Sequence, residues 1–141
     1  MSSSVGNTPK ESRNLMPKVV QTAGRDALGT FAPQFGALND DVLFGEVWSN
    51  DDLTLKMRSI LTVTTLVAKG MADTSFEHHV ANAKKNGVSA REMAAILTHV
   101  AFYAGWPNAW AAFRVVLKVY ADDPLDLENP EAHGGIFGLG D

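Results

Sequence analysis

Residues 72–87, "ADTSFEHHVANAKKNG", hold two adjacent histidines, His78 and His79, whose side chains suit acid/base chemistry near neutral pH. On a helix, neighbouring side chains point about 100° apart. Phe76, Val80 and Ala83 form the apolar stripe of this segment, so we expect His79 at the edge of the buried face and His78 on the solvated side. His79 is then either a general acid/base or a boundary histidine bonded to a backbone carbonyl.

Glu46 and Arg58 are charged residues in otherwise apolar surroundings. Glu46, in "FGEVW", could take part in catalysis or form a salt bridge with Arg58 or Lys56. Arg58 interrupts a largely apolar helix, where a guanidinium needs either a carboxylate partner or an anionic ligand. Arg58 is therefore a candidate for binding a substrate carboxylate, with a structural ion pair as the alternative.

A second group of candidates lies in "THVAFYAGWPNAW", residues 98–110. His99 and Tyr103 are four residues apart, on one edge of a helix that also carries Glu92. His99 could be a second catalytic group or a metal ligand, or a packed polar partner of Glu92 or Tyr103. We expect Tyr103 and Trp106 to line or pack the end of a pocket, at a corner fixed by the Gly-Trp-Pro sequence.

Metal chemistry would need His79, His99 and Glu46 together, as a set of two histidines and one carboxylate. No H-x-x-x-H or E-x-x-H spacing occurs in the chain, so we predict no metal ligand. The absence of cysteine excludes thiolate metal sites, disulfides and every thiol-based mechanism. A Ser-His-Asp signature, a phosphate-binding glycine loop and a nucleotide motif are also absent from the sequence.

The composition is that of a folded protein with one domain. The chain has 141 residues, of which 45% are apolar and 20% charged, and a formal net charge of −4. It has no basic block and no basic amphipathic face, which argues against a nucleic-acid partner and against membrane binding. The N-terminus lacks the apolar stretch of a signal peptide, so we expect a cytoplasmic protein.

The remaining pattern predicts an all-α domain over residues 13–121, between a flexible tail at 1–12 and an extended tail at 122–141. No strand-like alternation persists, whereas helix start and stop signals are dense. The C-terminal tail could dock its apolar residues on a neighbour. About six helices are expected, over residues 14–28, 40–48, 52–69, 74–86, 89–103 and 107–121.

Most of these helices begin at a residue that could accept hydrogen bonds from the first turn. The expected caps are Asn39 or Asp40, then Asn50 or Asp51, then Asp73 or Thr74, and finally Ser89 in a capping box with Glu92.

Two of the expected helices are apolar on more than one side. Residues 52–69 are apolar almost all round, so this helix should be central or covered on several sides. In addition, on the helix expected over residues 89–103, Phe102 points away from the apolar stripe. The main stripe of the last helix is expected at Trp110, Phe113, Val116, Leu117 and Tyr120, with further apolar residues opposite. Two-sided helices in so small a domain predict contacts between subunits, and hence a homo-oligomer.

The chain resembles the carboxymuconolactone decarboxylase family, part of the alkylhydroperoxidase D-like superfamily, over roughly residues 25–121. The resemblance rests on "LFGEVWSNDDLTLKMRSILTVTTLVAKG" and on "HHVANAKKNGVSAREMAAILTHVAFYAGWPNAW". It implies an alkylhydroperoxidase D-like bundle of about six helices, assembled as trimers or hexamers, with pockets at or near subunit contacts.

The peroxidases of this superfamily carry the motif C-x-x-C-x-x-x-H. Aligning its histidine on His79 puts the two cysteines at Ala72 and Ser75. Neither residue has a thiol, so hydroperoxide reduction by the family mechanism is excluded.

The decarboxylase branch, by contrast, needs neither a thiol nor a cofactor, and the resemblance implies a small lactone substrate that bears a carboxylate. The roles that follow are carboxylate binding by Arg58, acid/base catalysis by His79, assistance at the enolate by His99 or Tyr103, orientation of His79 or Arg58 by Glu46, and a pocket wall at Trp106. A metal-dependent enzyme and a non-catalytic oligomeric binding protein on the same scaffold are the alternatives.

Overall fold

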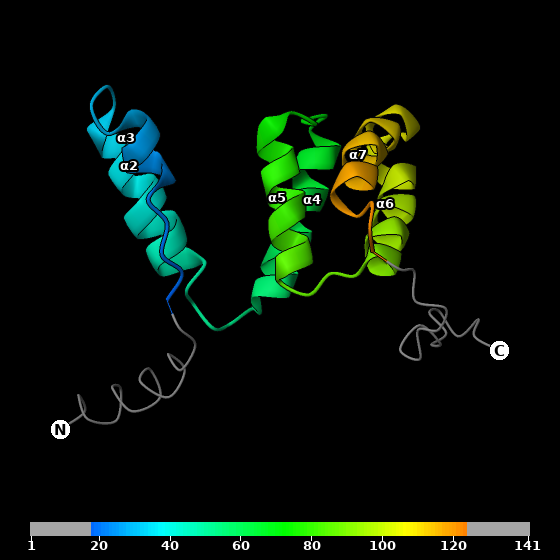
Figure 1. The fold of residues 1–141 in the computed structure, drawn as a ribbon, viewed down its shortest axis with the longest axis horizontal. Coiled ribbons are helices and arrows are strands. Elements are labelled where there is room, and N and C mark those ends of the chain that lie inside the picture. Colours follow the sequence, from blue (N-terminus) through cyan, green and yellow to red (C-terminus); the bar gives the residue numbers. More distant parts are fainter. Residues whose placement is uncertain (1–17, 124–141) are drawn as a thin grey trace. The chain divides into compact units, whose positions relative to one another are not determined.

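The computed structural model describes residues 18–123. Within this range the chain forms six α-helices, one π-helix and no strand, which confirms the predicted all-α class (Figure 1). The elements are α2 (Ala23–Leu28), α3 (Pro33–Ala37), the π-helix η1 (Leu38–Val47), α4 (Leu55–Ala68), α5 (Thr74–Lys85), α6 (Ala90–Ala104) and α7 (Trp106–Val119). The chain divides into two compact units between Arg58 and Ser59, an N-terminal unit and a C-terminal unit. The tail predicted at 1–12, and residues 124–141 of the tail predicted at the C-terminus, lie outside the described residues.

The N-terminal unit is built on a close contact between two glycines. Gly24, in α2, and Gly36, in α3, are both buried. A β-carbon on Gly24 would lie 2.7 Å from the carbonyl oxygen of Gly36, and one on Gly36 would lie 2.9 Å from the carbonyl oxygen of Gly24. A carbon and an oxygen atom that are not bonded do not pack this closely in a protein interior. The two helices therefore meet backbone to backbone at a point where only glycine fits.

Asp40 completes this contact from η1. Its carboxylate is fully buried, Oδ1 accepting the N–H of Gly24 and Oδ2 the N–H of Arg25, each at 2.9 Å. Arg25 in turn donates through both guanidinium nitrogens to Asp41. Burial acts to raise the pKa of Asp40, but hydrogen bonds from Asn39 and from the backbone, together with the charge of Arg25, outweigh it and lower that pKa.

Asp40 therefore caps a different helix from the one predicted. Because α3 runs into η1 without a break, no helix starts at Asn39 or Asp40, and that prediction is wrong. The predicted helix over 14–28 is wrong at its start, since α2 begins at Ala23. The N–H groups that Asp40 binds belong to the first turn of α2 and fix its start there, while Val19 donates its N–H to Ser49 Oγ at 2.7 Å instead.

The C-terminal unit has one apolar core, formed where four helices gather (Figure 1). The predicted stripe of α5 is confirmed, because Phe76, Val80 and Ala83 are fully buried. Each large apolar side chain buried in this way stabilises the folded state by about 1.5–3 kcal/mol. The partners of the stripe are Val63 and Val67 of α4, Val88, Met93 and Leu97 around α6, and Ala112, Val115, Val116 and Tyr120 around α7.

Local sequence signals set the ends of α5 and α6 as predicted. Asp73 caps α5 by accepting the N–H of Phe76 at 3.1 Å. Ser89 and Glu92 form the reciprocal capping box of α6, with hydrogen bonds of 3.1 and 2.9 Å. Gly105 ends α6. Its φ of +101° is a backbone conformation that favours glycine.

The start of α4 differs from the prediction. Thr54 Oγ1 accepts the N–H of Met57 at 3.0 Å and so caps this helix, which begins at Leu55. Asn50 instead accepts the N–H of Asp52 at 2.7 Å in the turn before the helix. The predicted caps, Asn50 and Asp51, are therefore wrong by one turn.

The C-terminal end of α7 is held by α5 and by the turn between α5 and α6. Tyr120 donates its hydroxyl to the carbonyl of Val88 at 2.8 Å. Burial, then the charges of Asp123 and Glu92, raise the pKa of Tyr120 to about 12, so the hydroxyl keeps its proton and remains a donor. Lys84 Nζ donates to the carbonyl of Val119 at 3.1 Å and pairs with Asp123 at 3.0 Å.

The predicted buried face of α7 is right in part. Val116 and Tyr120 are buried as predicted, whereas Trp110 and Leu117 are 58% and 68% exposed. Ala109, Ala112 and Val115 complete the buried face, and the small alanines let α7 pack closely against its neighbours. The prediction for α4 is wrong within the described residues, because this helix is buried along one stripe and is not covered on several sides.

Replacing Gly24 by Ala should destabilise the N-terminal unit by about 1–3 kcal/mol, the usual cost of overpacking. The new methyl group would meet Asp40 and the Gly36 carbonyl at 2.7 Å. Urea unfolding followed by circular dichroism measures the loss. The control is Ala27→Ser, at an exposed position of α2, which should change the free energy of unfolding by less than about 0.5 kcal/mol. Equal effects from the two variants would contradict the close contact.

The buried carboxylate of Asp40 also predicts how stability depends on pH. Its pKa is lower in the folded chain than in the unfolded chain, so its contribution is present above the unfolded value, near pH 4, and is lost as the pH falls through the folded value. Asp40→Asn should therefore weaken the loss of stability below about pH 4. Urea midpoints measured across this range test the prediction, and an unchanged slope in the variant would contradict it.

Candidate functional site

His79 lies at the edge of the buried stripe of α5. It is partly buried, whereas Val80 beside it is fully buried and His78 is exposed, which confirms the predicted orientations of the two histidines. Within residues 18–123, neither ring nitrogen of His79 makes a hydrogen bond. The described chain therefore lacks the bond to a backbone carbonyl that a boundary histidine would make.

The surroundings of His79 favour its neutral form. Burial is the larger cause, and the positive charge of His78 is the second; together they lower the pKa of His79 below its ordinary value of 6.5. At pH 7 the imidazole is therefore mainly uncharged and has one donor and one acceptor nitrogen. This is a group that can accept or deliver a proton near neutral pH.

A hydrogen bond joins α5 to α4 on the same edge of the helix. Asn86 follows His79 by close to two helical turns and so lies on its side of α5. Asn86 Nδ2 donates to Ser59 Oγ at 2.9 Å, and Ser59 is only 1% exposed. Ser59 is not among the site residues predicted from the sequence. The available signal was a hydroxyl on an apolar helix, directly after Arg58.

His99 and Tyr103 form a ring pair at the surface of α6. Their ring centroids are 5.2 Å apart, and the side chains of both residues are exposed. His99 thus packs against Tyr103, whereas the side chain of Glu92 caps the start of the helix. Within the described residues, His79 makes no hydrogen bond, ion pair or ring contact with this pair.

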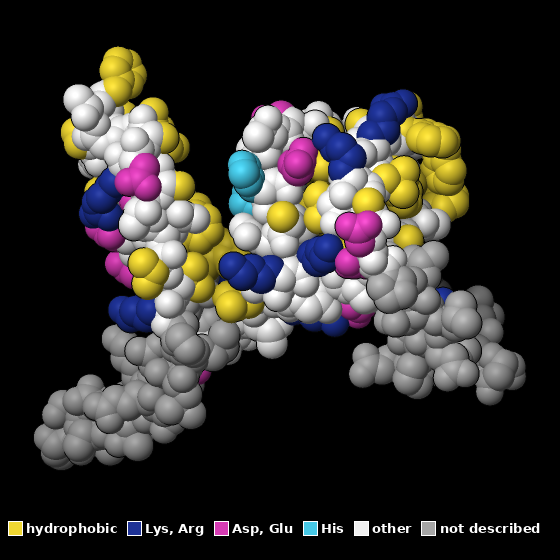
Figure 2. Space-filling view, viewed as in Figure 1, with side chains coloured by type: hydrophobic (Ala, Val, Ile, Leu, Met, Phe, Trp, Pro, Cys, Tyr) yellow, Lys and Arg dark blue, Asp and Glu magenta, His cyan; other side chains and the backbone are white. Residues whose placement is uncertain are grey.

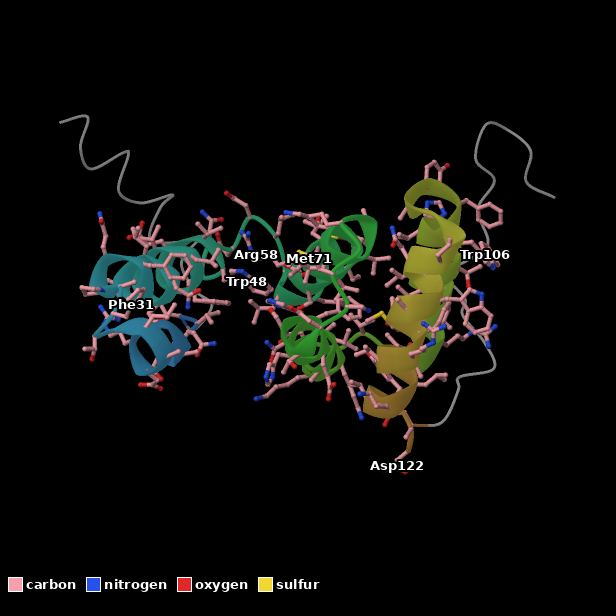
Figure 3. The ribbon with its side chains drawn as sticks, turned by 90° about the horizontal axis from the view of Figure 1, so that it is seen from above. Phe31, Trp48, Arg58, Met71, Trp106 and Asp122 are labelled. Atoms are coloured by element: carbon pink, nitrogen blue, oxygen red, sulfur yellow. The ribbon has the colours of Figure 1, made fainter. Side chains whose placement is uncertain are left out.

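Trp106 lines a hollow on the outer side of α6 and α7, where Figure 3 shows its side chain. The hollow has a volume of about 320 Å³. Its other lining residues are Thr98, Ala101, Ala109, Trp110, Phe113 and Leu117. None of these side chains titrates near neutral pH, so acid/base chemistry has no group to act with inside this hollow. The hollow and His79 are separate features.

Glu46 and Arg58 belong to the N-terminal unit. Glu46 is exposed on η1. Arg58, labelled in Figure 3, is partly buried and donates from Nη2 to the carbonyl of Asn50 at 3.0 Å. A backbone carbonyl is therefore one of the partners of the guanidinium.

Two further features of the described chain bear on the type of site. Among the residues that the structure describes, no three His, Cys, Asp or Glu side chains gather as a metal-binding group. In the same part of the chain, every helix is too short or too polar to cross a membrane.

Replacing His78 by Gln should raise the pKa of His79, because the variant removes the positive charge that lowers it. Proton NMR of the imidazole Cε1–H signals, assigned with single His→Gln variants, measures this pKa directly. We expect a midpoint for His79 below 6.5 that moves upward in His78→Gln. A midpoint at or above 6.5 in the wild type, or no movement in the variant, would contradict the environment described for His79.

Comparisons with known proteins identify the family of the chain. The chain is 32% identical over 95 residues to a 4-carboxymuconolactone decarboxylase of Acinetobacter baylyi, which covers 67% of this chain and 70% of that protein. It is 31% identical over 90 residues to the nitrosuccinic acid decarboxylase npaB of Metarhizium robertsii, which covers 62% of each. The family pattern extends over residues 33–118, from α3 into the last turn of α7. The chain belongs to the carboxymuconolactone decarboxylase family.

Proposed function

We propose that this chain is a cofactor-independent decarboxylase acting on a small carboxylated, lactone-like substrate, with His79 as the acid/base. The observation that carries the proposal is the state of His79, a partly buried imidazole with a lowered pKa and, in the described chain, no hydrogen bond to its ring. Both relatives are named as decarboxylases, which supports the type of reaction.

The chemistry needs a place for an electron pair and a source for a proton. When carbon dioxide leaves, the electrons of the broken carbon–carbon bond pass into a conjugated carbonyl group and form an enolate. The imidazolium of His79 would deliver its proton to the enolate carbon and then regain one from solvent. A lowered pKa makes this imidazolium a stronger proton donor than an exposed histidine, at the cost of a smaller protonated fraction at pH 7.

The other predicted residues have supporting roles in the proposal. Arg58 would bind a carboxylate of the substrate, which is the ligand best matched to a guanidinium. His99 or Tyr103 would donate to the enolate oxygen. Glu46 would orient Arg58 or His79. Trp106 would form a wall of the pocket where copies of the chain meet, since within one copy its hollow is separate from His79.

We also propose that the chain acts as a homo-oligomer, a trimer or a hexamer, with its pockets at or near contacts between copies. The support is the number of large apolar side chains that the described chain leaves exposed. They occur in both units, with Phe31 and Phe35 in the first and Phe102 and Trp110 in the second.

Replacing His79 by Gln should abolish turnover of 4-carboxymuconolactone or of a related carboxylated lactone, since glutamine cannot transfer a proton near pH 7. Loss of the lactone absorbance, or release of carbon dioxide, measures turnover. The matched control is His78→Gln at the neighbouring exposed position, which should retain most of the activity.

Helix content and molecular mass should be the same in the wild type and in both variants, because neither ring enters the core. Unchanged turnover in His79→Gln would overturn the role of His79. If ligands raise the melting temperature but no lactone or keto acid in a substrate screen is turned over, the chain is a binding protein instead.

A further inference from the structure

Asn86, which caps the end of α5, has an amide group that the described chain uses only in part. Its Nδ2 donates one N–H to Ser59 Oγ at 2.9 Å, while the second N–H and the carbonyl Oδ1 have no hydrogen-bond partner within residues 18–123. Asn86 is partly buried and Ser59 is 1% exposed, so the bond to α4 holds the amide in place. The remaining N–H is therefore a positioned donor that a ligand can use.

The two edges of α5 use their polar side chains differently. The edge toward α7 carries Glu77 and Lys84, and both form ion pairs. The edge toward α4 carries His79 and Asn86, and in the described chain neither forms an ion pair. Figure 2 shows histidine side chains at the surface of α5. On the edge toward α4, a proton-transfer group and a hydrogen-bond donor are thus both available to a small molecule.

The bond between Ser59 and Asn86 also determines which parts of α4 and α5 lie at the same level. It joins the start of α4 to the end of α5, and residues 69–73 connect the other two ends, so the helices run in opposite directions. Counted from this bond, residues 61–66 of α4 lie level with the stretch of α5 between His79 and Asn86.

A shallow hollow lies on α4 at this level. Its volume is about 260 Å³, and it is lined by Leu61, Thr62, Thr65 and Leu66. Leu66 follows Ser59 by seven residues, so it lies on the side of α4 that faces α5. The lining is apolar with two hydroxyl groups, and the volume is close to the lower end, about 300 Å³, of small-molecule sites. A small ring therefore has room beside the α4 edge of α5.

The spacing of His79 and Asn86 restricts which atoms of a ligand they contact. Their α-carbons are about 10 Å apart along the helix. Contact with the ligand takes up about 3 Å at each end, which leaves roughly 4–5 Å between the two contacted atoms. In a conjugated enolate, the oxygen and the carbon that accepts a proton are several bonds apart and match such a separation. Because Asn86 is uncharged, it also suits a carbonyl oxygen better than a carboxylate, which a guanidinium binds more strongly.

We propose that Asn86 binds the carbonyl oxygen of the substrate lactone and donates to it as it becomes the enolate oxygen, while Ser59 positions the amide. The proposal rests on the decarboxylation proposed above and adds to it a donor from the same helix as His79. The bond to the departing carboxyl carbon breaks, and its electron pair passes through the conjugated system to the carbonyl oxygen. When the carbonyl group forms again, the carbon takes a proton from His79, and Asn86 keeps its own protons throughout.

The first test compares the turnover of 4-carboxymuconolactone by Asn86→Ala and Asn82→Ala. Loss of one donor to an enolate oxygen should lower kcat by about 100–1000-fold in Asn86→Ala. Asn82 is exposed one turn earlier on α5, so Asn82→Ala is the matched control and should keep the wild-type kcat. Asn86→Asp can still accept a hydrogen bond from Ser59 but has no amide N–H, and it should lose at least as much kcat as Asn86→Ala. Circular dichroism should show the same helix content in all of them.

A double variant tests the positioning role of Ser59. Ser59→Ala should lower kcat because it releases the amide of Asn86. The variant with both Ser59→Ala and Asn86→Ala should then be no slower than Asn86→Ala alone, since the amide that Ser59 positions is already gone. If the two losses multiply instead, Ser59 acts only through packing, which contradicts its positioning role.

Binding of unreactive ligands gives a measurement that does not depend on turnover. The probes are a saturated carboxylated lactone and the cyclic ether of the same ring size, which lacks the carbonyl group. Isothermal titration calorimetry should show that the wild type and Asn82→Ala bind the lactone about 3–10-fold more tightly than the ether. In Asn86→Ala this ratio should fall to about 1.

Failure of this proposal and failure of the proposed reaction give different results. If the wild type turns over the lactone but Asn86→Ala keeps the kcat of Asn82→Ala, Asn86 is not the donor, while the decarboxylation stands. An equal preference for the lactone over the ether in the wild type and Asn86→Ala would likewise overturn the contact alone. If the wild type turns over no carboxylated lactone, the decarboxylation fails, and the role of Asn86 at an enolate fails with it.

Discussion

The burial of Phe76, Val80 and Ala83 fixes the rotation of α5 about its axis, and the candidate site depends on that rotation. Turning the helix by the angle of one residue, about 100°, would expose a fully buried phenyl ring and cost about 1.5–3 kcal/mol for that side chain alone. With the stripe in place, His79 can only lie at its edge. The same rotation brings Lys84, which lies on the opposite edge of the buried stripe from His79, to the C-terminal end of α7.

The packing of α7 shows how a core can determine an outer surface. Alanines at 109 and 112 let the helix approach its neighbours closely, which leaves the large side chains of Trp110 and Leu117 on the far side. A core made from the larger residues would hold the helices further apart and would have no hollow beside Trp106. The exposed aromatic face is therefore a consequence of the tight packing inside.

The sequence could predict features that depend on a few neighbouring residues, and it failed where distant residues decide. Ser89 and Glu92 act on each other within one turn, so their capping box was predictable. Asp40 was assigned to the wrong helix because the N–H groups it binds are 15 and 16 residues away. For the site, periodicity gave the rotation of His79, but not the hydrogen bond between Asn86 and Ser59 on the same edge of α5, because those two residues lie 27 positions apart.

The two adjacent histidines can thus be related without forming a two-histidine site. Their side chains point about 100° apart, so one substrate atom cannot meet both rings from the same side. Charge, unlike direct contact, acts over several ångströms, and a protonated His78 makes protonation of His79 less favourable. His78 is exposed, so salt and solvent weaken this effect, and burial remains the larger cause of the lowered pKa. The core therefore sets the acidity of His79 to a first approximation, and its exposed neighbour adjusts it.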